Sequence, residues 1–353
     1  MKFTLFFLSL IGSSMLLNAQ TPVWVSGQGG LYFMTLDDHS GELSDPALVH
    51  EFGSGSWLEF HPELPIIYAS FQGPDASGLK AFHYAQDGTV DSLDEINIPS
   101  TSVSHFAVNS QGTLIGGAHY SGQTTSLVSL NKEGSFERVE DTFSHEGSGP
   151  NPRQSKAHPH WAGFSSNGEV LHVTDLGTDN IFNFEVSSSP HAQLQLRDKT
   201  ELPPGTGPRH LAFNQAKSRA YVSGELTYHV SVFDYDQEAA VFTTMQHVRA
   251  VPSDMDEEVN TLSEIRVHPS GHFLYSGNRG HDSIAVFSID ESTGQIQLIE
   301  NEPVRGDWPR NFNITADGKW MLVAGQYSDS ISVFSIDQKT GRLTYARHRT
   351  SIP

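Results

Sequence analysis

Cysteine is absent from the 353-residue chain. This absence excludes disulfide bonds, thiolate metal sites and a cysteine nucleophile. Basic residues are also scarce, since 21 Lys and Arg stand against 41 Asp and Glu, for a formal net charge of −20. Such a surface repels nucleic acid and anionic membranes, so we expect neither as a partner. An anionic ligand would therefore have to be bound by a local cluster of basic side chains.

Long apolar runs are absent after the first 20 residues. Near the start, Lys2 precedes an apolar run from Phe3 to Leu17, which is followed closely by the small residue Ala19. The run is short for a membrane span, and the pattern is typical of a secretory signal peptide cleaved near Ala19. An N-terminal anchor helix is the alternative. We predict a signal peptide over residues 1–19 and a secreted or periplasmic protein, with a single domain over residues 20–353.

The sequence also lacks the common catalytic motifs. It has no Gly-x-Ser-x-Gly elbow, no His-Glu-x-x-His, no Walker loop and no nucleotide-binding glycine fingerprint. We therefore expect no cofactor and no covalent nucleophile. Acid/base and electrostatic catalysis remain.

A repeat of about 50 residues runs through the whole chain. Short alternating segments with a bulky central residue recur seven times, centred on Met34, Phe82, Val128, Phe184, Phe233, Phe287 and Phe334. This period lies in the range of propeller blades. Before each of the last six copies, two further apolar runs flank a turn that usually contains Gly or Pro, as in EIRVHPSG followed by FLYSG. The pattern predicts an all-β fold, a seven-bladed β-propeller of four-stranded antiparallel blades. Two stacked β-sandwiches are the alternative.

The first copy lacks an inner strand, because VWVSGQ (residues 23–28) reads as a second strand. We expect the C-terminus to supply the missing strand and close the ring. The chain ends at Pro353, soon after LTYARHRT, so this closure is expected to be weak or incomplete.

In a propeller, the starts of the inner strands and the ends of the second strands lie at the same face, around one opening of the central channel. We call this opening the mouth, and the repeat predicts which residues lie there. Inner strands begin near Trp57, His105, His158 with His160, Arg209 with His210, Glu264 and Arg310. Second strands end near Tyr120, Asp175, Glu225, Asn278 with Arg279, and Gln326. Arginines suit carboxylate or phosphate groups, since the planar guanidinium binds two oxygens at once.

Structural roles are the alternative for these residues. Asp175 and Asp179 can pin turns through backbone N–H groups. Arg209, Glu225 and Arg279 can form an ion-pair network between blades. His158 and His160 flank a proline at a spacing that could bind a metal, but no acidic partner is close in sequence, and we predict no metal site.

Taken together, HPHWAGFSSNG with VTDLGTDNIFNF, GTGPRHLAFN with AYVSGEL, and SGNRGHDSIAVFSID with WPRNFNITADGKW are motifs of one family. The chain resembles the seven-bladed propeller lactonases, which include propeller-type 6-phosphogluconolactonases and carboxy-muconate lactonising enzymes. The resemblance covers most of the chain and is strongest from His158 to Thr344. It implies catalytic roles for His158, His160, Arg209, Glu225 and Arg279. It also implies that His210 and Arg310 lie beside them. We predict substrate contacts from these two residues and from three residues that the repeat places at the mouth, Asp175, Asn278 and Gln326.

We therefore predict a monomeric, exported hydrolase that opens an aldonolactone-like or acidic sugar lactone. Arg209 and Arg279 would hold the anionic group and polarise the carbonyl, while His160 or Glu225 activates water. One alternative is a cycloisomerase acting on a muconate-type diacid. Another is a propeller that only binds a sugar acid, a glycan or a protein, because a fold predicts function weakly.

Overall fold

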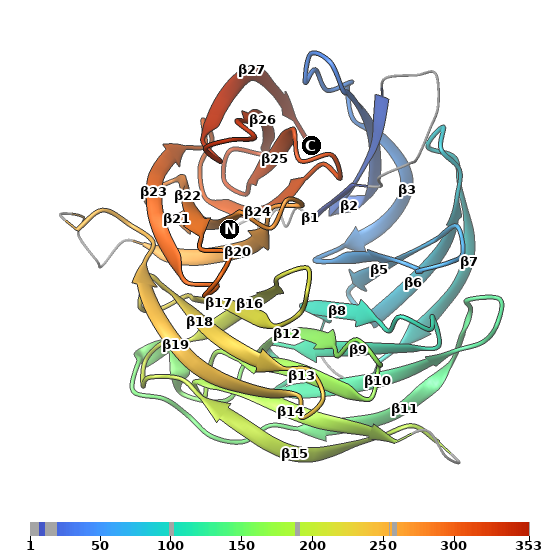
Figure 1. Ribbon diagram of the computed structural model, residues 1–353. Helices are drawn as coiled ribbons and strands as arrows, with labels where there is room; N and C mark the ends of the chain where they lie inside the picture. The colour runs from blue at the N-terminus through green and yellow to red at the C-terminus, as the bar shows by residue number, and fades with distance from the viewer. Residues whose placement is uncertain are drawn as a thin grey trace.

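The computed structural model describes residues 7–10, 20–98, 102–187, 191–253, 255 and 260–352. These residues form six antiparallel β-sheets arranged in a ring around a central channel (Figure 1). The first sheet contains seven strands, β1 (Phe7–Leu10), β2 (Gln20–Asp37), β3 (Ala47–Ser54), β4 (Leu58–Phe60), β5 (Ile66–Gln72), β6 (Ser77–Tyr84) and β7 (Val90–Asn97). The protein is thus an all-β propeller.

Each of the other five sheets is a four-stranded blade, with its strands in chain order from the channel outward (Figure 1). Their inner strands are β8 (His105–Val108), β12 (Pro159–Phe164), β16 (Pro208–Phe213), β20 (Thr261–Val267) and β24 (Pro309–Ile314). The second strands are β9 (Leu114–His119), β13 (Val170–Asp175), β17 (Arg219–Gly224), β21 (Phe273–Arg279) and β25 (Trp320–Gly325). The third strands are β10 (Thr124–Leu130), β14 (Asn180–Ser187), β18 (His229–Asp236), β22 (Ser283–Ile289) and β26 (Ser330–Ile336). The outer strands are β11 (Phe136–Ser144), β15 (Gln193–Glu201), β19 (Val241–Arg249), β23 (Ile296–Pro303) and β27 (Leu343–Ser351).

The repeated bulky residue of the sequence pattern lies in the third strand of each four-stranded blade and is fully buried there. Phe233 in β18 and Phe287 in β22 are both inaccessible to solvent. At each of these two residues the pairing with the outer strand shifts register by a β-bulge. A bulge bends and twists a strand locally, which suits the curved outer edge of a blade. The sequence repeat therefore marks a repeated packing position between sheets.

A tyrosine on the second strand ties neighbouring blades together. The Tyr221 hydroxyl donates to the carbonyl of Gly294 at 3.1 Å, and the Tyr275 hydroxyl donates to that of Gly341 at 2.9 Å. Both glycines have positive φ and lie in the turn between the third and outer strands of the next blade. Tyr68 makes the same bond to Gly134 at 2.7 Å. These bonds satisfy buried phenols while fixing the spacing between sheets.

The first and last sheets close the ring by side-chain packing. Val23 and Met34 of β2 share a core cluster with Val333 of β26. In addition, the Trp320 indole donates to the carbonyl of Asp38 at 3.1 Å. The prediction that the C-terminus supplies the missing inner strand is wrong, because β27 pairs with β26 as the outer strand of the last blade. Instead β1 pairs with residues 23–26 of β2.

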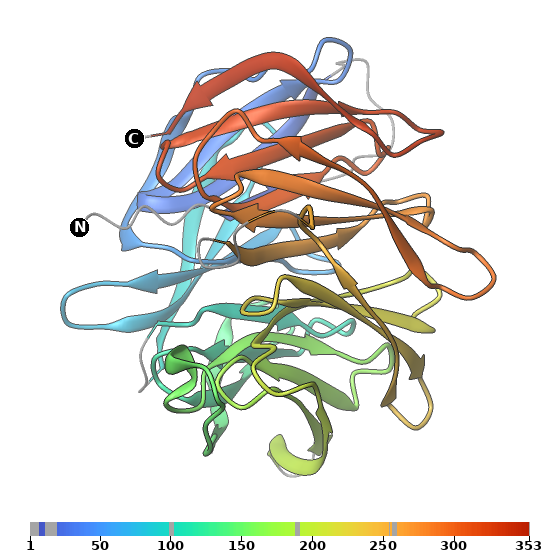
Figure 2. The ribbon, with the colours of Figure 1, turned by 90° about the vertical axis from the view of Figure 1, so that its left-hand side faces the viewer.

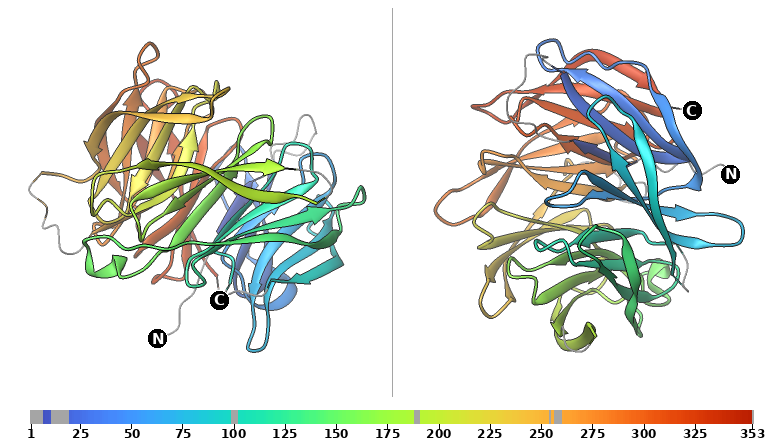
Figure 3. Two further views of the ribbon diagram at one scale, coloured as in Figure 1. Left: turned by 90° about the horizontal axis from the view of Figure 1, so that it is seen from below. Right: turned by 90° about the vertical axis from the view of Figure 1, so that its right-hand side faces the viewer.

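The strand register brings the predicted mouth residues to one face of the ring. Pro159 is opposite Asp175, Pro208 is opposite Gly224, and Pro309 is opposite Gly325, so each inner-strand start lies beside a second-strand end. The side views place the C-terminal end of β27 and a short 3₁₀ turn, η1 (Pro152–Gln154), at this same face (Figures 2 and 3). None of the helical turns in the described ranges is long and apolar enough to cross a membrane.

Candidate functional site

A cavity of about 290 Å³ opens at this mouth of the channel. It is lined by residues from inner-strand starts, second-strand ends and the loops beside them: Ser56, Trp57, Ser102, Ser104, Tyr120, Ser121, Arg153, His160, Arg209, His210, Glu225, Arg279, Arg310 and Asn311. Four arginines face one small space. The local charge is thus opposite to the charge of the whole protein.

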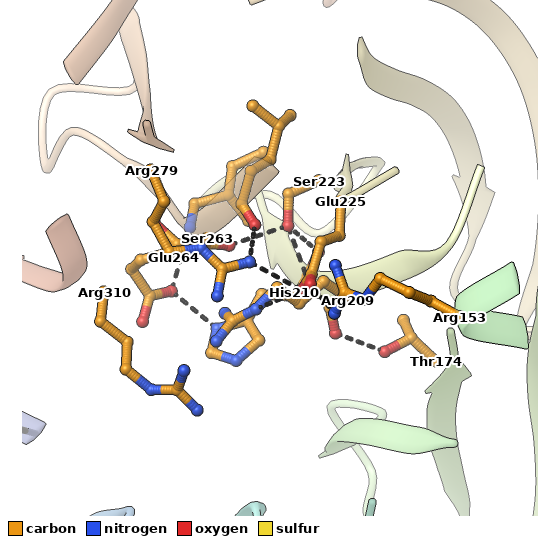
Figure 4. Close-up of polar contacts among 12 residues, drawn as sticks. Arg153, Thr174, Arg209, His210, Ser223, Glu225, Ser263, Glu264, Arg279 and Arg310 are labelled. Atoms are coloured by element: carbon orange, nitrogen blue, oxygen red, sulfur yellow. Dashed lines mark hydrogen bonds and ion pairs between the residues drawn. The ribbon is translucent and has the colours of Figure 1, made fainter. Parts of the chain in front are cut away.

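Glu225 lies at the centre of this cluster, directly after β17 (Figure 4). Its Oε1 is 2.5 Å from Nη2 of Arg153, and its Oε2 is 2.9 Å from both Nε of Arg209 and Nη2 of Arg279. The Glu225, Arg209 and Arg279 side chains are 2%, 3% and 6% exposed, whereas that of Arg153 is 46% exposed. Burial alone would raise the Glu225 pKa, but the three guanidinium groups outweigh it and lower that pKa to about 2.

The cluster carries more positive charge than Glu225 can balance. Arg310 donates to Oε1 of Gln326 at 3.5 Å, and within the described residues no carboxylate lies within ion-pair distance of it. Burial and the nearby Arg279 lower the pKa of Arg310 to about 10, so the side chain stays cationic at neutral pH. Nη1 of Arg209 is buried and has no hydrogen-bond partner in the described part of the chain. Unsatisfied buried donors are costly, so this arrangement favours an anionic or polar ligand.

A second buried pair joins His210 to Glu264. Nδ1 of His210 is 3.1 Å from Oε1 of Glu264, and both side chains are 4% exposed. Burial lowers the pKa of His210 to about 4, although Glu264 opposes this shift. Burial also opposes ionisation of Glu264, yet His210 and Arg266 lower its pKa to about 2. At neutral pH the pair is therefore a neutral imidazole beside a carboxylate.

The other two candidate histidines differ in their surroundings. His160 lines the cavity, and its Nδ1 is buried with no hydrogen-bond partner among the described residues. Burial and Arg209 hold the His160 pKa well below its usual range. His158 stacks on Tyr120 with ring centroids 4.2 Å apart, and its Nδ1 is 3.0 Å from the Tyr120 carbonyl. His158 therefore supports the wall, while His160 faces the ligand space.

Most of the predicted residues come together at this cavity. His160, Arg209, His210, Glu225, Arg279 and Arg310 all line it, and Gln326 contacts Arg310 from the end of β25. The ion-pair network that was the structural alternative for Arg209, Glu225 and Arg279 is also present. The functional and the structural interpretation of these residues are compatible, because the ion-pair network still has an excess of positive charge.

Asp175 lies outside the cavity lining. It is fully buried, and its Oδ1 accepts from the backbone N–H groups of His158 at 2.7 Å and Gly177 at 2.9 Å. Its Oδ2 lies 3.1 Å from Nδ1 of His145. Asp175 thus holds the turn after β13, because a short carboxylate beside free N–H groups satisfies the backbone first.

Asn278 also lies away from the lining. Its amide donates to the carbonyl of Ala250 at 3.0 Å and to the Ser283 hydroxyl at 3.1 Å. Side chains alternate across a strand, so the neighbouring Arg279 points into the mouth while Asn278 points between sheets.

Sequence reasoning missed Arg153 and Asn311 as site residues and left Glu264 outside the nominated set. Arg153 comes from η1, where Asn151 and Gln154 form a capping box around Pro152. The NPRQ sequence signals such a turn. Nothing local indicates that its arginine meets a glutamate 72 residues later.

Within the described ranges, no group of three or more His, Asp or Glu side chains is arranged to hold a metal ion. His158 and His160 do not converge on one point, since the former bonds a carbonyl and the latter faces the cavity. The site instead offers cationic and imidazole groups.

Comparison with known proteins shows which family and which solved structures the chain is similar to. A family model described as "Lactonase, 7-bladed beta-propeller" matches residues 18–353. A 6-phosphogluconolactonase of Bacillus subtilis is 29% identical over 328 residues, covering 93% of each chain. A crystal structure of a protein from Lactobacillus plantarum matches at a TM-score of 0.86 and 26% identity, covering 100% of this chain and 97% of that one.

The periplasmic gluconolactonase of Pseudomonas aeruginosa has the same fold. Its structure matches at a TM-score of 0.86 and 23% identity, covering 99% of this chain and 97% of that one. At this identity the likeness concerns the fold alone.

The buried histidines predict that acid destabilises the protein. Burial lowers the pKa of His172 and His210 to about 4, and it holds the pKa of His105 and His160 well below the usual range. Between about pH 6.5 and 4 the unfolded chain therefore binds more protons than the folded one. The free energy of unfolding should fall as the pH falls through this window, by up to about 1.4 kcal/mol per pH unit for each histidine.

Glu59 acts in the opposite direction, because burial raises its pKa to about 7, but the four buried histidines together outweigh it. Urea unfolding at pH 7, 6 and 5 measures the slope. A free energy of unfolding that stays constant over this range would contradict the buried, neutral state of these histidines.

Proposed function

The chain belongs to the lactonase family of seven-bladed β-propellers, and on this basis we propose that it is an exported hydrolase of lactones that carry an acidic group. 6-Phosphogluconolactone and related sugar-acid lactones are the substrate class. The observation that carries this proposal is the surplus of arginine at the channel mouth. Arg209, Arg279 and Arg310 present more cationic donors than Glu225 can neutralise.

The excess of positive charge at the mouth has two roles in the proposed reaction. Arg310 binds the anionic group of the substrate, since its charge has no carboxylate partner in the described chain. Arg209 and Arg279 are fixed by Glu225, so their free N–H groups can stabilise the negative charge that develops on the lactone carbonyl oxygen. A histidine of the cavity wall removes a proton from the attacking water.

Glu225 is a weak candidate for that base. Both of its oxygens contact guanidinium groups, and its pKa of about 2 makes it a poor proton acceptor at neutral pH. We assign it the role of holding the arginines. This leaves His160 and His210 as the side chains that can activate water.

We further propose that residues 20–353 form one domain of seven blades. The first sheet then consists of two blades, with β2 folded back on itself at Gly29 and Gly30, which both have positive φ. In support, the rings of Trp24 and Phe33 are 4.8 Å apart. Nine residues of extended strand would separate them by about 30 Å.

Export is proposed from the sequence of residues 1–19, of which the described structure includes only the backbone of β1. We predict that protein recovered from outside the cytoplasm begins at or near Gln20. Intact-mass measurement of that protein gives the cleavage site. A mature chain that retains Phe7–Leu10 would contradict cleavage and would assign β1 to the working protein.

The substrate proposal predicts different effects of Arg310→Met on charged and neutral lactones. Losing one charge-assisted contact costs about 1.5–3 kcal/mol, so KM for 6-phosphogluconolactone should rise about 10- to 100-fold. KM for gluconolactone should change by less than about threefold, because that lactone lacks the charged contact. Acid release followed in a pH-stat measures both.

Arg305→Met is the matched control, since Arg305 contacts Glu302 on the exposed surface. It should leave both KM values unchanged. Equal effects of Arg310→Met on both lactones would remove Arg310 from anion binding. Failure of the unaltered protein to hydrolyse either lactone would overturn the proposed function itself.

A further inference from the structure

We propose that Glu264 is a positioning residue that makes His210, in preference to His160 or Glu225, the base that activates water. The carboxylate accepts a hydrogen bond from the Nδ1–H group of His210, and this tautomer leaves Nε2 unprotonated for the reaction. This inference rests on the proposed lactone hydrolysis. It adds a residue and a tautomer that the family resemblance did not supply.

The geometry of Glu264 fits an orienting role. Its Oε1 is 3.1 Å from Nδ1 of His210 and also accepts from the backbone N–H of Ile265 at 3.0 Å. Its Oε2 accepts from the Asn311 amide and lies 3.6 Å from Nη2 of Arg266 (Figure 4 shows the contact to His210). A carboxylate fixed at both oxygens cannot rotate away, so the imidazole that it contacts is fixed as well.

The position of the pair in the channel supports the same role. His210 lines the mouth cavity, whereas Glu264 lines a second cavity of about 390 Å³ deeper in the channel. Glu264 thus contacts the imidazole from the side away from the substrate. With Nδ1 engaged there, Nε2 is the ring nitrogen left for a water molecule in the mouth.

The competing bases lack this arrangement. His160 has a buried Nδ1 without a partner in the described residues, so no contact selects its tautomer. Glu225 is ion-paired with three arginines. A base needs both a free lone pair and a fixed orientation, and in this cavity His210 has both.

Several charged and titratable groups face His210 from neighbouring elements. Glu264 and Arg266 approach from β20, Arg209 precedes it in β16, and the rings of His105 and His160 lie 5.3 Å and 5.1 Å away. Burial and the two arginines disfavour the imidazolium ion, and Glu264 is the group that favours it. Removing the charge of Glu264 therefore makes His210 a weaker base.

Nε2 of His210 takes one proton from water, and the water oxygen bonds to the lactone carbonyl carbon while the C=O π pair moves to the carbonyl oxygen. The oxyanion is held by the arginines. When it collapses, the ring C–O bond breaks and the ring oxygen takes the proton back from Nε2. The product is the open hydroxy acid, and His210 returns to its starting state.

Glu264→Gln tests the proposal with a side chain of the same shape and no charge. General-base catalysis contributes about 10²- to 10⁴-fold, so kcat for the lactone should fall at least about 100-fold. KM should stay within about threefold, because the arginines are intact. The acid limb of the kcat profile should move to lower pH, a shift that a purely structural role would not cause.

Glu59→Gln is the matched control. Glu59 is another carboxylate of the deeper cavity, but it accepts from the Trp57 indole at 3.3 Å, and among the described residues it forms no hydrogen bond or ion pair with a histidine. This variant should keep its kcat and its acid limb. If Glu264→Gln retains kcat within threefold of the unaltered protein, or if both variants lose activity equally, the positioning role is overturned.

A spectroscopic readout separates this inference from the lactone substrate. In protein labelled with ¹⁵N-histidine, the His210 resonances, assigned with His210→Gln, should show a protonated Nδ1 and an unprotonated Nε2 at pH 7. Glu264→Gln should redistribute the tautomers. If the unaltered protein hydrolyses no lactone but shows this tautomer, the proposed function fails and the pairing stands. If Nε2 carries the proton, the inference fails even where lactone is hydrolysed.

Discussion

The mouth of the channel depends on one buried carboxylate held by three guanidinium groups. Glu225 follows β17, Arg209 is the second residue of β16, Arg279 ends β21, and Arg153 comes from the η1 turn. Burying cations is costly unless they are paired and hydrogen-bonded. By pairing with all of them, Glu225 allows several arginines to share a cavity and joins neighbouring blades through charge as well as packing.

The same interaction sets the charge that a ligand meets. The protein carries a formal net charge of −20, which opposes the approach of an anion. The arginine surplus at the mouth reverses that sign locally, inside walls that screen charge poorly. An anion is therefore attracted to this mouth, whose cavity is also lined by His210 and His160.

Much of this architecture could be predicted from the sequence, because it follows from a repeat. The bulky residue of each copy, such as Phe233, became the buried residue of a third strand. The register that puts inner-strand starts beside second-strand ends also followed, and it brought Arg209, Glu225 and Arg279 together.

The remaining features depend on tertiary contacts that no local pattern encodes. Arg153 reaches Glu225 only once the ring has formed. Asp175 occupies the predicted position but accepts from the backbone N–H groups of His158, before β12, and of Gly177, in its own turn. The pairing of β1 with residues 23–26 of β2 and the commitment of the chain end to β27 as an outer strand are also tertiary features.

The free energy of unfolding of Glu225→Gln measures the central interaction most directly. Removing one partner of a buried ion pair costs about 3–5 kcal/mol, and we predict a loss of that size in urea unfolding at pH 7. Glu302→Gln, at a surface pair with Arg305, should cost less than about 1 kcal/mol. A Glu225→Gln protein as stable as the unaltered one would contradict a stabilising role for the Glu225 ion pairs.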